Sequence, residues 1–381
     1  MATQPLRVVH MTTVHPPFDP RIFYKQLATL RDAGYDVHLI APHASAERVC
    51  GIPIHALPRP EHRRQRLALQ PQAFRKARAL EADIYQIHDP ELLPLAFLLK
   101  RARGAPVVYD MHENYRAKGR LLGGGLRLLE RWGFTWLDHV LLAERSYRQV
   151  VAGRGVPHTF IGNYFVPIGE EKEAPPSALA STPTRLLYTG TVSDSRGLRT
   201  MVDLASVLRK ADRSETLTVV GVCHHDDQRA RAERRIRDRD LTSVLEWIGR
   251  DAYVPPSDMP PHYRRADVGL ALCEPHPNHT GSLLTKFYEY LHHGLPIICS
   301  DFPLWRRFVE THDCGALVPP GNAQAVLDVL DAWRSDPERF RQCARNARAA
   351  APQYRWASMG DRLLDVYHDL RAAGGARPAD A

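Results

Sequence analysis

Residues 283–303, LLTKFYEYLHHGLPIICSDFP, decide the fold class that we expect for this chain. Apolar residues at helical spacing between Leu284 and Leu291 predict a short amphipathic helix that ends at Gly294. The apolar run PIICS follows almost at once and predicts a buried strand. A helix that leads directly into a buried strand is typical of a parallel sheet covered by helices, so this stretch favours an α/β fold.

The same alternation of strand and helix continues in both directions and forms two series. The first series begins with the strand LRVVHM and the helix RIFYKQLATLRDAGY and ends with HTFIGN. A segment rich in Pro, Ser, Ala and Glu separates it from a second series, which begins with RLLYTG. We therefore expect two Rossmann-like, doubly wound domains that face one another across a ligand-binding cleft.

The domain boundaries follow from these patterns, and a length of 381 residues fits two domains. Residues 1–165 are expected to form the N-terminal domain, 166–184 a linker and 185–353 the C-terminal domain. Residues 354–373 are expected to form one more helix, and the small and polar tail 374–381 to be disordered.

Composition limits the classes of function. The formal net charge of +8 favours acidic partners such as phosphates or anionic lipid, although solvated Arg-rich surfaces explain it equally well. The basic residues are spread widely and no nucleic-acid-binding module is recognisable, so no nucleic-acid partner is expected. Six scattered cysteines without a CxxC pair, together with no signal peptide and no membrane-spanning run, favour a cytoplasmic location.

The loop after the first strand, MTTVHPPFDPRIF, carries His15 and Arg21. It lacks the GxGxxG turn of a nicotinamide or flavin site. Arg21 stands at the start of a helix and is a candidate for holding an anion. The competing interpretation is a proline-stiffened surface loop in which Asp19 caps that helix.

Two further strands end in polar residues, in IHDPELL and YDMHENY. They place His88, His112 and Glu113 at the same edge of the predicted sheet. Such side chains can bind sugar hydroxyls or assist proton movement. A metal site is disfavoured, because no two of these histidines have helical ligand spacing.

In the second domain, YTGTVSDSRGL follows a strand and opens a helix. Gly190 frees the backbone there, and Arg196 lies near the helix N-terminus. Backbone N–H groups and a charge-assisted contact together suit a diphosphate.

The predicted helix that ends at Gly294 offers a second anion site at its N-terminus. The N–H groups of residues 281–284 precede the helix, with Ser282 and Thr285 as N-cap candidates. Lys286 would add a mobile positive charge. Glu289 can accept hydrogen bonds from a ribose or sugar diol, and the competing interpretation is an exposed ion pair with Lys286.

The chain resembles the retaining glycosyltransferases of the GT-B fold, of the family 4 or group 1 type. The segments that carry the likeness are HPPFDPRIF, LRDAGYDVHLIA, YQIHDPELLPLA, VVYDMHENY, YTGTVSDSRGL, YRRADVGLAL and LLTKFYEYLHHGLPIICSDFP. The resemblance implies a nucleotide-sugar donor, a glycan or polyprenyl-linked acceptor bound mainly by the N-terminal domain, and a metal-independent reaction without a cofactor. It also implies that the last helix crosses back onto the first domain.

The resemblance gives individual residues a role. Glu289 matches the second acid of the E-x7-E motif and would hold the ribose, and His112 matches the histidine that approaches the transferred sugar. Arg196 stands in place of the lysine that contacts the diphosphate, and these three are the expected catalytic residues. The expected donor-binding residues are Gly190, Thr191, Arg196, Arg250, Gly281, Ser282, Leu283, Leu284, Lys286 and Glu289. The expected acceptor-side residues are His15, Arg21, His88 and Glu113.

Two positions depart from the family pattern. The first acid of E-x7-E falls on Gly281, and an arginine of the diphosphate loop falls on Thr191. Asn278, His279 and Glu274 are the candidates to replace the missing acid. The departures keep two alternatives open, which are another GT-B enzyme, such as an epimerase or phosphorylase, and a non-catalytic partner subunit.

Two segments of the expected acceptor-binding domain suggest a contact with a membrane. The segments EHRRQRLALQPQAFRKARAL and YRAKGRLLGGGLRLLERWGFTWL combine Arg with Leu and Trp. This pattern fits a peripheral contact with an anionic membrane, and helices that face the domain core explain it about as well.

Overall fold

The computed structural model describes residues 4–112, 120–168 and 184–375. The chain divides into two compact units, each with its own sheet. Unit 1 comprises Met1–Val166 and Trp356–Ala381, and unit 2 comprises Pro167–Arg355. Most of the expected linker and residues 376–381 of the expected tail lie outside the described residues.

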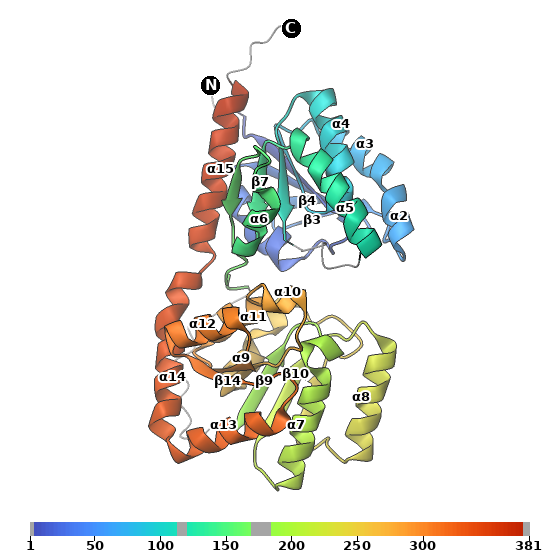
Figure 1. The fold of residues 1–381 in the computed structure, drawn as a ribbon. Coiled ribbons are helices and arrows are strands. Elements are labelled where there is room, and N and C mark those ends of the chain that lie inside the picture. The colour runs from blue at the N-terminus through green and yellow to red at the C-terminus, as the bar shows by residue number, and fades with distance from the viewer. Residues whose placement is uncertain (1–3, 113–119, 169–183, 376–381) are drawn as a thin grey trace. The chain divides into compact units, whose positions relative to one another are not determined.

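Unit 1 is built on one mostly parallel sheet (Figure 1). Its strands are β1 (Arg7–Met11), β2 (Asp36–Pro42), β3 (Glu47–Val49), β4 (Ile52–Leu57), β5 (Ile84–Ile87), β6 (Val107–Met111), β7 (His139–Leu142) and β8 (His158–Phe160). Their order is β3-β4-β2-β1-β5-β6-β7-β8, and only the β3–β4 pair is antiparallel among the described strands. The winding direction therefore reverses between β1 and β5, where ligands bind in sheets of this kind.

The helices of unit 1 cover this sheet. They are the π-helix η1 (Pro20–Leu27), α1 (Ala28–Asp32), α2 (Arg63–Ala68), α3 (Gln70–Leu80), η2 (Pro90–Leu92), α4 (Leu93–Arg103), α5 (Arg120–Gly133), η4 (Phe134–Trp136), η5 (Arg145–Tyr147), α6 (Arg148–Val151) and α15 (Ala357–Gly375). The last of these packs on unit 1 although it follows unit 2 in sequence (Figure 1). Trp356 anchors its start by donating from Nε1 to Thr29 Oγ1 at 2.8 Å.

Unit 2 is built on a parallel sheet in the order β11-β10-β9-β12-β13-β14. Its strands are β9 (Arg185–Thr189), β10 (Thr216–Val220), β11 (Leu245–Ile248), β12 (Val268–Ala271), β13 (Ile297–Ser300) and β14 (Gly315–Val318). Its helices are η6 (Asp194–Arg196), α7 (Leu198–Lys210), α8 (Asp226–Asp238), η7 (Pro256–Asp258), α9 (Pro260–Arg265), α10 (Pro277–Thr280), α11 (Thr285–His293), α12 (Pro303–His312), α13 (Ala323–Ser335), α14 (Pro337–Ala350) and η8 (Ala351–Tyr354). The winding reverses between β9 and β12.

The expectation of two doubly wound α/β domains is confirmed. Strands β3 and β4 were not predicted from the sequence, and η1 and α1 were predicted as one regular helix. In unit 1 the core lies beneath β1, β5, β6 and β7 and includes Tyr85 and Tyr109. In unit 2 it lies between the sheet and helices such as α7 and α13.

Candidate functional site

The loop after β9 brings Arg196 to the reversal point of unit 2. Gly190 and Gly197 have left-handed backbone conformations, with φ of 98° and 89°. A Cβ on Gly197 would lie 1.9 Å from the Leu272 carbonyl oxygen, so this glycine lets α7 begin close to the end of β12. Arg196 ends the short helix η6 between the two glycines. Gly190 and Thr191 are exposed in the same loop.

The loop before α11 forms the other side of this reversal point, but the helix begins differently from the expectation. Leu284 is the N-cap, and no side chain caps the helix. Ser282 instead donates from Oγ to the backbone of α10, and its carbonyl accepts from Trp305 Nε1 at 2.8 Å. The N-cap roles predicted for Ser282 and Thr285 were therefore wrong. The first-turn N–H groups lack a capping side chain, as an anion site requires.

Lys286 is buried rather than mobile. It is 3% exposed, and its Nζ lies 3.4 Å from the centre of the Tyr188 ring. No described residue accepts a hydrogen bond from Nζ. Burial, with a smaller contribution from the charge of Arg196, lowers the pKa of Lys286 from 10.5 to about 7. A buried ammonium without hydrogen-bond partners is costly, and an anion would supply both the charge and the acceptors.

Arg196 lies close enough to Lys286 for the two charges to interact. Its guanidinium lies beside the Tyr188 hydroxyl, which donates to the Thr191 carbonyl at 2.8 Å. Burial, with smaller contributions from the charges of Arg196 and Lys286, lowers the pKa of His279 to about 4. Two cations and a helix N-terminus therefore converge at the reversal point of unit 2.

Glu289 lies one turn along α11 from this cluster. The Tyr263 hydroxyl donates to Glu289 Oε2 at 2.6 Å, and the Tyr263 ring stacks on His293 with ring centres 4.5 Å apart. The competing interpretation, an exposed ion pair with Lys286, is wrong because Lys286 is buried and Glu289 is held by Tyr263. The role of Tyr263 was not predicted from the sequence, although Tyr263 begins YRRADVGLAL, one of the segments that carry the family resemblance.

The three candidates to replace the missing acid differ in burial and in their contacts. Gly281 has an ordinary backbone, with φ of −100°. Asn278 is exposed on α10, whereas His279 is buried and its Nδ1 lies 3.2 Å from the Glu274 carbonyl oxygen. Glu274 is half-buried and accepts from Thr200 Oγ1 at 3.3 Å. Glu274 and His279 are thus linked to each other beside the cationic cluster.

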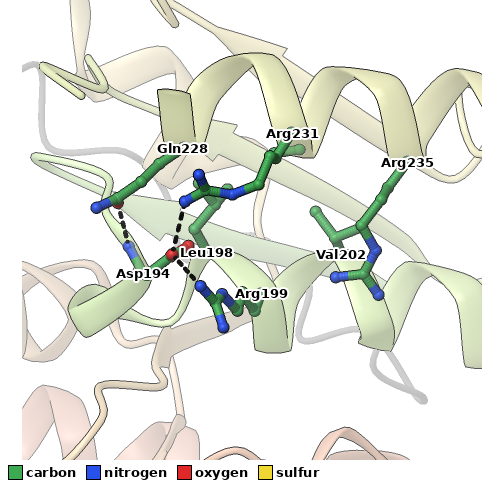
Figure 2. Close-up of a pocket in the computed structure, with 8 residues that line it drawn as sticks. Asp194, Leu198, Arg199, Val202, Gln228, Arg231 and Arg235 are labelled. Carbon is green, nitrogen blue, oxygen red and sulfur yellow. Dashed lines mark hydrogen bonds and ion pairs between the residues drawn. The ribbon is translucent and has the colours of Figure 1, made fainter. Parts of the chain in front are cut away.

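Arg250 does not join this cluster in the contacts of the described chain. It is exposed after β11 and pairs with Glu233 of α8 at 3.5 Å. A separate pocket of about 310 Å³ is lined by α7, α8 and Asp194 (Figure 2). Arg199 and Arg231, which line it, both pair with Asp194 (Figure 2). Because these charges are already paired, this pocket is a weaker anion site than the Lys286 cluster.

Unit 1 has a different kind of polar cluster at its reversal point. Asp110, at the end of β6, is fully buried. Arg21 donates to both of its oxygens, with Nη2–Oδ1 2.6 Å and Nε–Oδ2 2.9 Å. Gln26 donates to Oδ2 at 2.9 Å. The expectation that Arg21 holds an external anion was wrong, because its donors are used by Asp110 and the Ile161 carbonyl. Asp19 caps η1, as the competing interpretation proposed.

His88 extends this cluster toward the C-terminal helix. Its Nδ1 lies 3.1 Å from Asp110 Oδ2, and its Nε2 lies 3.1 Å from His10 Nδ1. His10 Nε2 in turn lies 3.1 Å from the Tyr367 hydroxyl of α15. Burial is the main cause that lowers the pKa of both histidines, so both are neutral at pH 7.

The cluster also resembles a metal-binding group in geometry. His88, Asp110 and His112 each offer one ligand atom within 4.8 Å of the others. A metal ion would compete with the Arg21 guanidinium for the same carboxylate. The arrangement therefore favours an ion-pair cluster, and metal independence stays a prediction.

His112 and His15 meet at the edge of this cluster. The Nε2 atoms of the two rings are 2.8 Å apart. His112 Nδ1 lies 3.1 Å from the Asp110 carbonyl oxygen. Glu113, predicted for the acceptor side, lies outside the described residues. The structure thus brings together His15, His88 and His112 in unit 1.

Comparison with protein families gives two adjacent matches. The glycosyl transferase 4-like domain matches residues 21–163, and the glycosyl transferases group 1 model matches residues 169–350. The two matches together cover most of both units.

Curated relatives match over nearly the same length. The chain is 24% identical over 360 residues to a phosphatidyl-myo-inositol mannosyltransferase of Mycobacterium leprae, covering 92% of this chain and 90% of that protein. A shorter match, 23% identical over 154 residues, covers 39% of this chain and 35% of the amylovoran biosynthesis glycosyltransferase AmsK of Erwinia amylovora.

Solved structures share the fold. A sucrose-phosphate synthase from Thermosynechococcus elongatus matches with a TM-score of 0.76 at 16% identity, over 97% of this chain and 100% of that one. The Anabaena protein HepE in complex with UDP and glucose matches with a TM-score of 0.70 at 14% identity, over 96% of this chain and 100% of that one. These likenesses confirm the expected GT-B architecture.

Proposed function

Because this chain belongs to the group 1 glycosyltransferases of the GT-B fold, we propose that it transfers a sugar, with retention of anomeric configuration, from a nucleotide-sugar donor to a glycan or lipid-linked acceptor. Such a reaction would serve the synthesis of a cell-surface polysaccharide or glycoconjugate. The names of the mannosyltransferase and of the amylovoran enzyme support this class of product.

The observation that carries the proposal is the unpartnered Lys286. Its ammonium is buried beside Arg196 at the N-terminus of α11, and no described residue accepts its hydrogen bonds. The diphosphate of a nucleotide sugar supplies negative charge and several acceptor oxygens in one group. We assign the diphosphate to this cluster, where the cations and the helix N-terminus stabilise the charge that develops on the leaving nucleoside diphosphate. In this proposal these groups replace a metal ion.

Glu289 is the proposed ribose ligand. Its carboxylate is held by Tyr263 at 2.6 Å and still has acceptor capacity for two neighbouring hydroxyls. The nucleobase would lie against the backbone near Gly249 and Arg250, which directly follow β11. Glu274 and His279 are the proposed contacts to the donor sugar, since Gly281 has no side chain.

Retention follows if the acceptor attacks from the face that the diphosphate leaves. The acceptor oxygen bonds to the anomeric carbon, the bond from that carbon to the phosphate oxygen breaks, and a phosphate oxygen takes the acceptor proton. No second enzymic carboxylate is needed in this route. His112 is the proposed unit 1 residue beside the transferred sugar.

The acceptor-binding unit also has a surface suited to lipid. None of the helices in the described residues has the length and hydropathy of a membrane span. Leu67, Leu98, Leu128 and Trp132 are 42–70% exposed, and their helices α2, α4 and α5 lie at one side of unit 1 (Figure 1). Exposed arginines such as Arg131 accompany them. We propose that this face rests on an anionic bilayer.

Vesicle sedimentation tests the membrane contact. The purified chain should sediment with phosphatidylglycerol vesicles at low salt and stay in solution with phosphatidylcholine vesicles. A Leu128→Ser, Trp132→Ala variant should lose sedimentation, whereas Tyr253→Ala, which alters an exposed aromatic of unit 2, should keep it. No sedimentation of the unaltered chain with anionic vesicles would remove this part of the proposal.

Donor binding and transfer test the central proposal. A thermal-shift series with UDP-, GDP-, ADP- and dTDP-sugars should identify one donor class that raises the melting temperature. Glu289→Ala and Arg196→Ala should then weaken binding of that donor and reduce transfer at least tenfold. Arg199→Ala is the matched control, because Arg199 stands in the neighbouring turn and pairs with Asp194. Equal behaviour of all three variants would contradict the site assignment.

A further inference from the structure

Two histidine rings of unit 1 share a hydrogen bond. The Nε2 atoms of His15 and His112 are 2.8 Å apart, and the ring planes are tilted by 56°. The two side chains are nearly buried, with exposed fractions of 12% and 10%. A nitrogen–nitrogen contact of this length requires a hydrogen on one atom and a lone pair on the other. The pair therefore holds one proton between its two Nε2 atoms.

The contacts of His112 Nδ1, the ring nitrogen that does not face His15, determine the tautomer of that ring. His112 Nδ1 lies 3.1 Å from the Asp110 carbonyl oxygen and 3.3 Å from its carboxylate. Both atoms are acceptors, so Nδ1 carries a hydrogen. A neutral His112 then accepts from His15, and a doubly protonated His112 donates to it. The hydrogen bond with His15 thus determines whether His112 Nε2 acts as an acceptor or as a donor.

Carboxylates surround His15. Its Nδ1 lies 3.6 Å from Asp19 Oδ2, and its Nε2 lies 3.6 Å from Asp89 Oδ1. Burial alone would raise the pKa of Asp19, but the hydrogen bond to His15 and the charges of His15 and His112 hold that pKa well below its ordinary value. His15 therefore lies within 3.6 Å of two carboxylates while its Nε2 atom also faces His112.

Other charged groups among the described residues contact His112 or its partner Asp110. Asp110 faces His112, but Arg21 pairs with the same carboxylate at 2.6 Å. His88 also contacts Asp110, and burial keeps it neutral by lowering its pKa. Asp19 and Asp89 are thus the carboxylates that are not offset by a guanidinium in the described contacts, and they act on the pair through His15.

A second histidine pair in the same unit lies in a different environment. His38 Nδ1 lies 3.0 Å from His55 Nε2 across β2 and β4. Burial lowers the pKa of both rings, to about 4 for His55. A carboxylate, Asp36, contacts only the His38 ring, at 3.2 Å. This pair is neutral at pH 7 and serves as a matched control.

We propose that His15 and His112 act as one catalytic pair, in which His15 is the positioning residue that sets the orientation and proton of His112. The inference deepens the proposed function and rests on it, because the family resemblance places His112 beside the transferred sugar. Without His15, the His112 ring loses its partner at Nε2, and Asp19 and Asp89 lose their contacts with the pair.

Histidine NMR tests the pair without any substrate. In the full chain labelled with ¹⁵N-histidine, with signals assigned through His112→Gln and His15→Gln, a scalar coupling between the two Nε2 atoms should report the shared hydrogen bond. In His15→Ala this coupling should be lost and the Nε2 signal of His112 should shift. Absence of the coupling in the unaltered chain, or an unchanged Nε2 signal of His112 in His15→Ala, would overturn the proposal.

Transfer kinetics test the role of the pair. With the donor identified by thermal shift, His15→Ala should lower kcat about 10- to 100-fold while the donor KM stays within about twofold. His15→Gln keeps an N–H donor and should recover most of kcat, and His55→Ala should match the unaltered enzyme. Equal losses in both His15 variants, together with a lower melting temperature, would indicate a structural role and overturn the proposal. If no donor supports transfer by the unaltered chain, the proposed function fails, and the NMR spectra still decide whether the pair exists.

Discussion

The two units differ in whether their buried charged side chains have hydrogen-bond partners. In unit 1 the carboxylate of Asp110 receives hydrogen bonds from Arg21 and Gln26, and its cluster continues through buried histidines to Tyr367. In unit 2 the ammonium of Lys286 is equally buried, yet its Nζ has no hydrogen-bond partner in the described chain. A charge whose partners are built into the fold supports structure, whereas a charge left without them is available to a ligand.

The comparison also explains why the two clusters belong to different steps of the proposed reaction. The unit 1 cluster is satisfied before any ligand binds, so it can hold His112 in a fixed position. The unit 2 cluster is incomplete, so the diphosphate supplies the charge and acceptors that the protein omits. Preorganised cations of this kind act on the leaving group without rearrangement.

The largest effect is expected at Asp110. Asp110→Asn leaves the Arg21 guanidinium buried without its opposing charge, which should lower the free energy of unfolding by about 3–5 kcal/mol. Denaturation in urea measures the change. Asp313→Asn is the matched control, because Asp313 also binds an arginine, Arg339, through both oxygens but is about half exposed. The free energy of unfolding of the control should fall by less than about 1 kcal/mol. Similar decreases in both variants would show that the buried ion pair stabilises the fold no more than the exposed one.

At Lys286 the expected sign is reversed. Lys286→Met removes a buried charge and should raise the free energy of unfolding by about 2–4 kcal/mol at pH 6, while donor binding is lost. Both folded and unfolded states carry the proton below pH 7. The advantage of the variant should therefore be full there and shrink as pH rises from about 7, the folded pKa, toward 10.5. A destabilised variant would show that Lys286 has a partner within the fold.

Donor affinity should depend on pH through the same lysine. Lys286 must be protonated to bind the diphosphate, and its pKa in the free protein is about 7. Affinity should therefore be constant below pH 7 and fall by up to about tenfold per pH unit above it. Calorimetry with a nucleotide sugar in two buffers of different ionisation enthalpy measures the affinity and the proton uptake together. Constant affinity from pH 6 to 9 would remove Lys286 from the donor site.

The smallest effect is expected at Tyr263. Tyr263→Phe removes the hydrogen bond to Glu289 and should weaken donor binding about three- to tenfold, which corresponds to about 1 kcal/mol. Tyr253→Phe, at an exposed tyrosine of the same unit, should leave the affinity unchanged. A loss in the control of similar size would show that the effect is not specific to Glu289.

The fold could be predicted from sequence because hydrophobic periodicity reports which face of each element is buried. The strand β3 was missed, since Glu47–Val49 is short and mostly exposed and so carries no alternating pattern. The sequence also did not indicate that the first helix begins as a π-helix. Its register depends on Asp19 and on the contacts of Arg21.

The site could be predicted only in part. The positions of Arg196 and Glu289 follow from strand ends and helix faces, which local sequence reports. The burial of Lys286 does not, because the Tyr188 ring that covers it comes from β9. The pairing of Arg21 with Asp110 likewise joins η1 to β6, and no local pattern indicates which carboxylate an arginine will meet.

The return of α15 to unit 1 has a consequence for biosynthesis. Tyr367 closes the His10 and Gln86 end of the unit 1 cluster, with hydroxyl contacts at 3.1 Å and 2.7 Å. During translation this residue emerges only after all of unit 2 has been made. Unit 2 can therefore fold as soon as it has been synthesised, whereas unit 1 is complete only after α15 has been synthesised. A nascent chain stalled before Trp356 would hold a complete second unit beside an unfinished first one.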